Sequence, residues 1–207
     1  MTNHYKTEGD IRVYDLKQSL VYLEAMGKKH YGKRFKLYPA DKDILYKLLV
    51  YAVQDIENCE KHNLDVKKGV LLTGPIGCGK TSLMFLLRYF VLSQEYHVMK
   101  PARDIAFEFI QEGYSCIQRY GSKNKTYCFD DLGVEQNIKY YGNECNVMGE
   151  ILLSRYDLFV RQGTKTHATT NLNATELEQL YGQRVRSRMR QMFNLIAFDK
   201  EVGDKRK

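Results

Sequence analysis

The sequence predicts an α/β fold in which a mainly parallel, five-stranded sheet is covered by helices on both faces. Short apolar runs typical of buried strands alternate with longer segments whose apolar residues recur at helical spacing. One junction between a strand and a helix, at residues 74–81, is a glycine-rich loop. The chain has 207 residues, which suits one such domain with a small addition.

Two helices are predicted ahead of the sheet. Residues 14–30 carry apolar side chains on one face, and residues 41–62 form a stronger amphipathic helix that is expected to pack on the sheet. We therefore divide the chain into an N-terminal helix with a basic arm, residues 1–40, and a main domain, residues 41–207.

The remaining elements follow in alternating order. The capping box Thr175-x-x-Glu178 is predicted to open a short helix, which leads into an arginine-rich turn or helix. Strands are predicted at 70–73, 96–99, 127–129, 165–170 and 195–198, and helices directly after the loop, at 104–120 and at 144–161.

Composition limits the cellular setting. No run approaches the ~18 apolar residues of a membrane helix, and the start MTNHYKTEGD lacks the apolar core of a secretory signal. The five cysteines are odd in number and form no C-x-x-C pair, which favours reduced thiols in the cytoplasm and argues against a zinc site. The net charge of +7 suits an anionic partner such as nucleic acid, but nucleotide-binding proteins are often basic without one.

The glycine-rich loop reads GPIGCGKT and matches G-x-x-x-x-G-K-[ST], the phosphate-binding loop of nucleotide triphosphatases. Its glycines let consecutive N–H groups face a phosphate, and the following helix adds the positive end of its dipole. Lys80 is placed to reach the β- and γ-phosphates of ATP, and the Thr81 hydroxyl to ligate Mg²⁺. The predicted nucleotide ligands are Gly74, Pro75, Ile76, Gly77, Cys78, Gly79, Lys80, Thr81 and Ser82.

Two acids end the third predicted strand, where such a loop requires a partner. Asp130 is predicted to hold Mg²⁺ together with Thr81, and Asp131 to orient or deprotonate the attacking water. Asn171 ends the fourth strand and is predicted to lie near the γ-phosphate and its water. Without the loop, the acids and the asparagine would be read as residues that start turns.

Two basic segments could contact phosphates. Lys28, Lys29, His30, Lys33, Arg34 and Lys36 are interleaved with Tyr31, Phe35 and Tyr38, a pattern of base stacking or of a solvated face with packed rings. In a further interpretation, Phe35 or Leu37 lies against the adenine of ATP. The run of arginines at 184–190 is read equally as a source of an arginine finger or as a phosphate-binding or solvated surface.

Together these motifs resemble the DnaC/IstB-type ATPases of the AAA+ superfamily, a group of helicase loaders and transposition helper ATPases. The resemblance covers residues 66–200. Its matching stretches, in family order, are GPIGCGKT (74–81), FDDLGVE (129–135), ATTNLN (168–173) and YGQRVRSRM (181–189).

The resemblance implies a P-loop NTPase fold of AAA+ type with strand order 5-1-4-3-2 and no C-terminal lid domain. Asn171 would be the sensor-1 residue. Arg188, with Arg184 as the alternative, would be the finger that reaches a neighbouring subunit's γ-phosphate. Family members bind single-stranded DNA and assemble ATP-dependently on a partner such as a replicative helicase or a transposase. Asp131 replaces the Glu of many AAA+ proteins, so slow hydrolysis is expected.

We therefore expect an ATP-hydrolysing, Mg²⁺-dependent protein that forms a homo-oligomer and acts as a helicase loader or as a helper in DNA replication or transposition. Two alternatives stay open. One is a small-molecule or nucleotide kinase that uses the same loop, and the other is a docking module that holds ATP without hydrolysing it. Phosphate release without an acceptor would exclude the kinase, and any measured hydrolysis would exclude the docking module.

Overall fold

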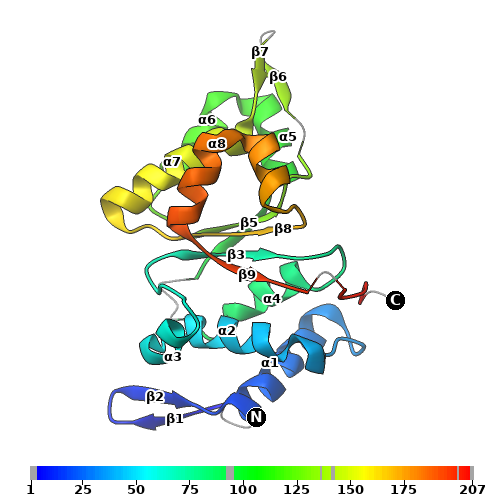
Figure 1. Cartoon of the computed structure of the whole chain (residues 1–207), viewed down its shortest axis with the longest axis vertical. Helices are drawn as coiled ribbons and strands as arrows, with labels where there is room; N and C mark the ends of the chain where they lie inside the picture. The colour runs from blue at the N-terminus through cyan, green and yellow to red at the C-terminus, as the bar shows by residue number, and fades with distance from the viewer. Residues whose placement is uncertain (1–3, 92–95, 136, 141–142, 200, 206–207) are drawn as a thin grey trace.

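A five-stranded sheet runs through the middle of the molecule (Figure 1). The computed structural model describes residues 4–91, 96–135, 137–140, 143–199 and 201–205. The strands of this sheet are β3 (Gly69–Thr73), β4 (Val98–Pro101), β5 (Tyr127–Leu132), β8 (Thr166–Thr170) and β9 (Phe193–Ala197).

The strands lie in the order β4-β5-β8-β3-β9, and every neighbouring pair is parallel. When the five strands of this sheet are numbered along the chain and read from the β9 edge, the order is 5-1-4-3-2. The predicted fold class is therefore confirmed. Thr73 pairs with Thr170, and Leu132 pairs with Thr170 from the other side. The carboxyl ends of β3, β8 and β5 therefore meet at one edge of the sheet, where open α/β sheets bind their ligands.

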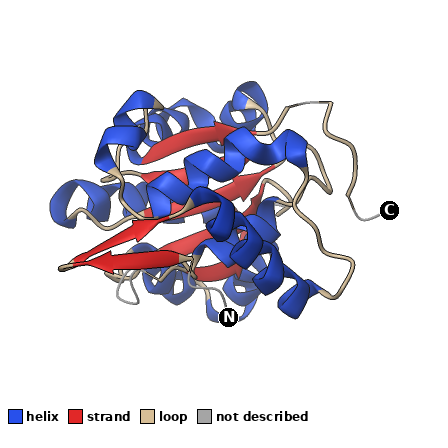
Figure 2. Cartoon of the chain, turned by 90° about the horizontal axis from the view of Figure 1, so that it is seen from below, coloured by secondary structure: helices blue, strands red, loops and turns tan. Residues whose placement is uncertain are grey.

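Two layers of helices cover the sheet (Figure 1, Figure 2). Alternate residues of β3 serve the two layers, since Val70 and Leu72 belong to one apolar core and Leu71 to the other. No helix among the described residues has the length and apolar character needed to span a bilayer. The first layer contains α1 (Leu16–Tyr31), α2 (Lys42–Ala52), α3 (Ile56–Lys61) and α4 (Lys80–Leu87), and the second contains α5 (Ala102–Glu112), α6 (Tyr114–Gly121), α7 (Val147–Gln162) and α8 (Ala174–Met192).

Two predicted helices are each divided in the structure. The helix predicted over 41–62 breaks at Gln54, which has a positive φ of 58°, and Asp55 caps α3 by accepting a hydrogen bond from the N–H of Asn58. The helix predicted over 104–120 breaks at Gly113, which has a φ of 59° and separates α5 from α6. Apolar periodicity continues across both breaks, which is why the pattern alone did not show them.

The cap of the last helix differs from the prediction. Asn173, not Thr175, is the N-cap of α8, and its partner in the capping box is Glu176, not Glu178. The predicted order of a short helix followed by an arginine-rich helix is found within α8, whose helical backbone is interrupted at Gly182 (φ 83°, ψ 161°), ahead of the arginine run.

Two antiparallel hairpins lie outside the central sheet and were not predicted. The first pairs β1 (Tyr5–Glu8) with β2 (Ile11–Tyr14), and the second pairs β6 (Ile138–Tyr140) with β7 (Asn143–Cys145). In Figure 1 the second hairpin projects from the end of the molecule that carries α5 and α8. The strands have three or four residues each, too few to produce a recognisable alternation of apolar and polar residues.

Candidate functional site

The glycine-rich loop joins β3 to α4, as predicted, and its glycines adopt conformations that other residues disfavour. Gly77 has a φ of 79° and Gly79 a φ of 102°. Gly79 is the N-cap of α4 and provides no side chain to cap the helix. The first N–H groups of α4, together with its dipole, therefore face the loop, where they favour an anion.

Lys80 lies inside the curve of this loop. Its side chain is buried, and its Nζ donates hydrogen bonds to the carbonyl oxygens of Gly74 (2.8 Å) and Pro75 (2.9 Å). The Sγ of Cys78 lies 3.9 Å from the same ammonium. Cys78 is buried, and burial raises the pKa of its thiol, which disfavours the reactive thiolate form.

Two strands and one helix, β5, β8 and α4, meet in one hydrogen-bond network beside the loop. The hydroxyl of Thr81 donates to Oδ1 of Asp130 at 3.0 Å, and the hydroxyl of Thr169 donates to the same oxygen at 2.6 Å. Thr169 in turn accepts from the N–H of Asp131 at 2.9 Å. Thr169, which the sequence analysis did not single out, thus ties the end of β8 to the two acids that end β5.

The two acids are held in different environments. Asp130 is buried, and burial raises the pKa of its carboxyl. The nearby Asp131 carboxylate raises this pKa further, whereas the hydrogen bonds from Thr169 and Thr81 and the charge of Lys80 lower it. Asp131 has a positive φ of 54° at an irregularity in the pairing of β5 with β8, and this turns its side chain into the cavity beside the loop.

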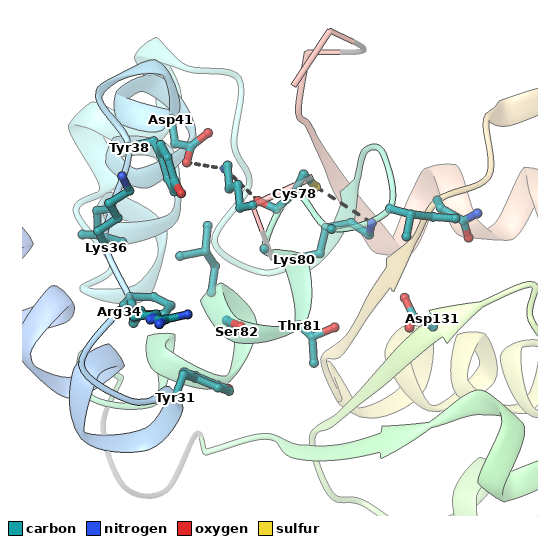
Figure 3. Close-up of a pocket in the computed structure, with 18 of the residues that line it drawn as sticks. Tyr31, Arg34, Lys36, Tyr38, Asp41, Cys78, Lys80, Thr81, Ser82 and Asp131 are labelled. Carbon is teal, nitrogen blue, oxygen red and sulfur yellow. Dashed lines mark hydrogen bonds and ion pairs between the residues drawn. The ribbon is translucent and has the colours of Figure 1, made fainter. Parts of the chain in front are cut away.

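A cavity of about 570 Å³ lies along the loop (Figure 3). Lys80, Thr81, Asp131 and Asn171 line one end of it, so the structure brings these predicted site residues together. Such a volume is typical of a cavity for a small molecule or cofactor. The opposite wall comes from the basic arm, namely Tyr31, Arg34, Phe35, Lys36, Leu37 and Tyr38.

The basic arm is therefore a wall of this cavity rather than a separate element. Phe35 and Leu37 both line it, in keeping with the interpretation that one of them contacts a base. The rings of Tyr31 and Phe35 stack on one another with centroids 5.6 Å apart, and Phe35 also covers Gly27 of α1. These aromatic rings are engaged in packing within the chain, while the charged groups of Arg34 and Lys36 stay exposed.

The donor atoms beside the loop suit magnesium. The Thr81 hydroxyl and the Asp130 carboxylate are hard oxygen ligands whose oxygens lie 3.0 Å apart. Mg²⁺ is typically held by one or two such groups together with phosphate oxygens and water. Within the described ranges, no cluster of three or more His, Cys, Asp or Glu side chains could hold a metal by itself. The residues present therefore fit a metal that arrives with a phosphate ligand.

Solved structures share this architecture. AMPPCP-bound DnaA from Aquifex aeolicus aligns with a TM-score of 0.53 and 16% identity, over 83% of this chain and 50% of that chain. DnaI aligns with a TM-score of 0.50 and 18% identity, over 72% and 85% of the two chains. The DnaC helicase loader aligns with a TM-score of 0.57 and 18% identity, over 79% of this chain and 92% of that chain. The chain has the fold of the DnaC helicase loader. No protein-family model and no curated protein matches the sequence.

In this DnaC-like fold, the arginine run lies on α8 beyond the kink at Gly182. Arg184 is exposed, and the guanidinium of Arg188 lies over the ring of Tyr156, 4.9 Å from its centroid. Arg186 lines a second cavity of about 500 Å³ behind the loop. None of these three arginines is among the described residues that line the cavity beside Lys80.

Glu135 connects the loop after β5 to the same helix. It is buried and accepts hydrogen bonds from the hydroxyl of Tyr181 and from the N–H of Gly133 (2.9 Å). Burial raises the pKa of this carboxyl. Glu135 lies in the stretch FDDLGVE, and its contact ties the loop after β5 to Tyr181, just ahead of the kink in α8.

Proposed function

We propose that this protein binds ATP with Mg²⁺ at residues 74–82 and hydrolyses it in an assembly of several subunits. The observation that carries this proposal is the network in which Thr81 and Thr169 both donate to Asp130, beside a cavity lined by Lys80, Asp131 and Asn171. Hydrolysis is the candidate function that uses every member of this group, because an acid and an amide beside the phosphates can position water.

Each residue has a defined task in this reaction. Lys80 supplies positive charge to the β- and γ-phosphates, and Thr81 and Asp130 provide the oxygens for Mg²⁺, which neutralises phosphate charge when bound. Asp131 and Asn171 line the same end of the cavity, where they orient the attacking water in line with the bond to be broken.

Arg188 completes the site from a neighbouring subunit, with Arg184 as the alternative. Its own chain holds it over Tyr156, at the surface of α8. An arginine finger supplied in trans typically raises turnover by about 10³–10⁵-fold, because it stabilises charge in the transition state. A lone subunit is therefore expected to be a poor ATPase.

We further propose that the assembly forms on single-stranded DNA and on a partner such as a replicative helicase or a transposase. The DnaC-like fold supports the role of a helicase loader or helper in DNA replication or transposition. The exposed charges of the basic arm support an anionic partner. We assign residues 41–207 to the main ATPase domain and residues 1–40 to the N-terminal helix and basic arm, which adds one wall to the cavity of that domain.

The test is ATP turnover per subunit, measured against protein concentration with and without single-stranded DNA. Turnover is expected to rise with concentration and DNA, and Arg188→Ala is expected to remove most of that rise, while the exposed Arg161→Ala leaves it unchanged. Turnover that is independent of concentration and identical in Arg188→Ala would contradict the role of the arginine.

Binding is tested separately with Lys80→Ala. This variant is expected to lose affinity for a non-hydrolysable ATP analogue, and the exposed Lys17→Ala serves as the matched control for removal of one lysine. Unchanged affinity in Lys80→Ala would overturn the assignment of the whole site.

A further inference from the structure

The residues that follow β9 lie along the phosphate loop, a contact that the sequence did not suggest. The N–H of Lys205 donates to the carbonyl oxygen of Gly77 at 3.1 Å. The carboxylate of Asp204 covers Gly77 so closely that a Cβ at this glycine would lie 2.1 Å from Oδ1. A side chain at position 77 is therefore disfavoured twice, by the positive φ and by contact with residues 201–205.

The side chain of Lys205 makes the strongest contacts of this segment. Its Nζ donates to Oδ2 of Asp41 at 2.5 Å and to the carbonyl oxygen of Cys78 at 2.7 Å. The ammonium also lies over the rings of Tyr38 and Phe198, 5.2 Å and 4.9 Å from their centroids. Hydrogen bonds and aromatic faces together replace much of the water that a lysine loses on burial.

Asp41 depends on this lysine. Its side chain is 6% exposed, and that of Lys205 is 16% exposed. Among the described residues, Oδ1 of Asp41 has no hydrogen-bond partner, so Lys205 provides the one bond to this carboxylate. Loss of the lysine would leave a buried carboxylate without a partner, which strongly destabilises the folded arrangement. We therefore expect the contact to be either fully formed or fully lost.

The pair lies in the wall of the nucleotide cavity and not at a remote surface. Asp41 and Lys205 both line the cavity and are joined by their hydrogen bond, and Figure 3 shows Asp41 in the cavity wall beside Tyr38. Asp41 ends the short helix η1 (Pro39–Asp41), directly after the part of the basic arm that forms the opposite wall. One contact therefore joins the arm, the loop and residues 201–205.

We propose that Asp41 and Lys205 form a latch that holds the phosphate loop in its nucleotide-binding arrangement, with Lys205 as a positioning residue for the triphosphate. This inference rests on the proposed function. Lys205 holds the carbonyl oxygens of Gly77 and Cys78, and a peptide unit is planar, so the N–H groups of the next two residues are fixed as well. Those N–H groups belong to the loop that is predicted to cradle phosphate.

The latch predicts that nucleotide binding and closure of residues 201–205 favour one another. Lys205→Met is expected to weaken binding of a fluorescent, non-hydrolysable ATP analogue by about 5–150-fold, the usual range of coupling between two sites. Lys205→Arg, which keeps the charge and donor groups, is expected to restore most of the affinity. Glu201→Gln removes an exposed charge in the same segment and is the matched control.

A double-mutant cycle separates a latch from general damage. Asp41→Asn and the double variant Asp41→Asn/Lys205→Met are expected to bind the analogue as weakly as Lys205→Met alone, because either change opens the same contact. Thermal unfolding of each variant shows whether the chain is folded. Losses that simply multiply in the double variant would overturn the latch.

The reciprocal measurement uses trypsin, which cuts after Lys205. Cleavage at this bond in the wild-type protein is expected to slow when the analogue is bound, since coupling between two sites is mutual. Faster cleavage with the analogue, or tighter binding by Lys205→Met, would mean that the segment competes with nucleotide and would overturn the proposal. Wild-type protein that binds no analogue at all would defeat the proposed function itself, whereas normal binding that is indifferent to Lys205 would defeat the latch alone.

Discussion

At the scale of one residue, the burial of the Asp130 carboxylate lowers the stability of the folded chain. This carboxyl is buried between β5, β8 and α4, and burial raises its pKa. Because the folded chain holds this proton more tightly than the unfolded chain, the contribution of Asp130 to stability falls as pH rises through the folded-state pKa. The hydroxyls of Thr81 and Thr169 reduce this cost without removing it.

Asp130→Asn is therefore expected to raise the melting temperature at pH 7 and to abolish Mg²⁺-dependent hydrolysis. The amide oxygen can still accept from both threonine hydroxyls, but the buried charge is gone. The difference in melting temperature between the variant and the wild type is expected to shrink as the pH is lowered, because the wild-type carboxyl then becomes protonated. Thermal unfolding at several pH values measures this, with the exposed Asp157→Asn as control. A variant less stable than wild type at pH 7 would show that Asp130 is stabilised as a charged group.

At the scale of an element, α8 combines two functions in two helical parts that are separated by the non-helical residue Gly182. Its first part begins at the cap on Asn173, two residues after Asn171, and its last part carries the arginine run. The kink at Gly182 sets the direction of the second part relative to the first. With a φ of 83° and a ψ of 161°, Gly182 occupies a backbone region that is essentially restricted to glycine.

Gly182→Ala is expected to destabilise the chain by about 1–3 kcal/mol, the usual cost of a non-glycine residue in such a region. It is also expected to weaken the stimulation of ATP turnover by assembly, since Arg188 would point elsewhere if the kink straightened. Urea unfolding and turnover against concentration test the two effects. The exposed neighbour Gln183→Ala is the control, and an unchanged free energy of unfolding in Gly182→Ala would show that the kink is not strained.

At the scale of the whole molecule, the effect of the net charge of +7 on anionic ligands depends on where the basic residues lie. Arg34 and Lys36 line the cavity beside the phosphate loop, so their charges would act on a nucleotide bound there as well as on any larger anion. Lys29 and Lys33 are exposed and do not line that cavity, which makes them the better reporters of contact with DNA.

Affinity for single-stranded DNA is expected to fall steeply with salt, with a log–log slope of about −0.7 for each phosphate contacted. Lys33→Ala should make that slope shallower by about 0.7 if this lysine contacts one phosphate. Fluorescence anisotropy with a labelled oligonucleotide across a salt series measures the slope, and Lys17→Ala on the same end of the chain is the control. Absence of binding even at low salt would leave the charge as a solubility property.

Most of the fold, and the residues at the phosphate end of the site, could be predicted from the local sequence. The loop and the acids Asp130 and Asp131 are contiguous motifs, and parallel strands bring their carboxyl ends together, so their convergence followed from strand order. The breaks at Gln54 and Gly113 and the cap at Asn173 were missed because apolar spacing dominates the pattern and shifts an element's boundaries easily.

The sequence by itself determined an α/β sheet with a phosphate-binding loop at the carboxyl end of β3, since motif, strand and helix are encoded by neighbouring residues. Only the tertiary structure decided which side chains complete the cavity. Thr169 bonds to Asp130 across two strands, and Lys205 reaches Asp41 from 164 residues away. Nothing in the local pattern marks such pairs, because their energy arises from burying two polar groups against one another, and the folded chain alone determines which groups become buried together.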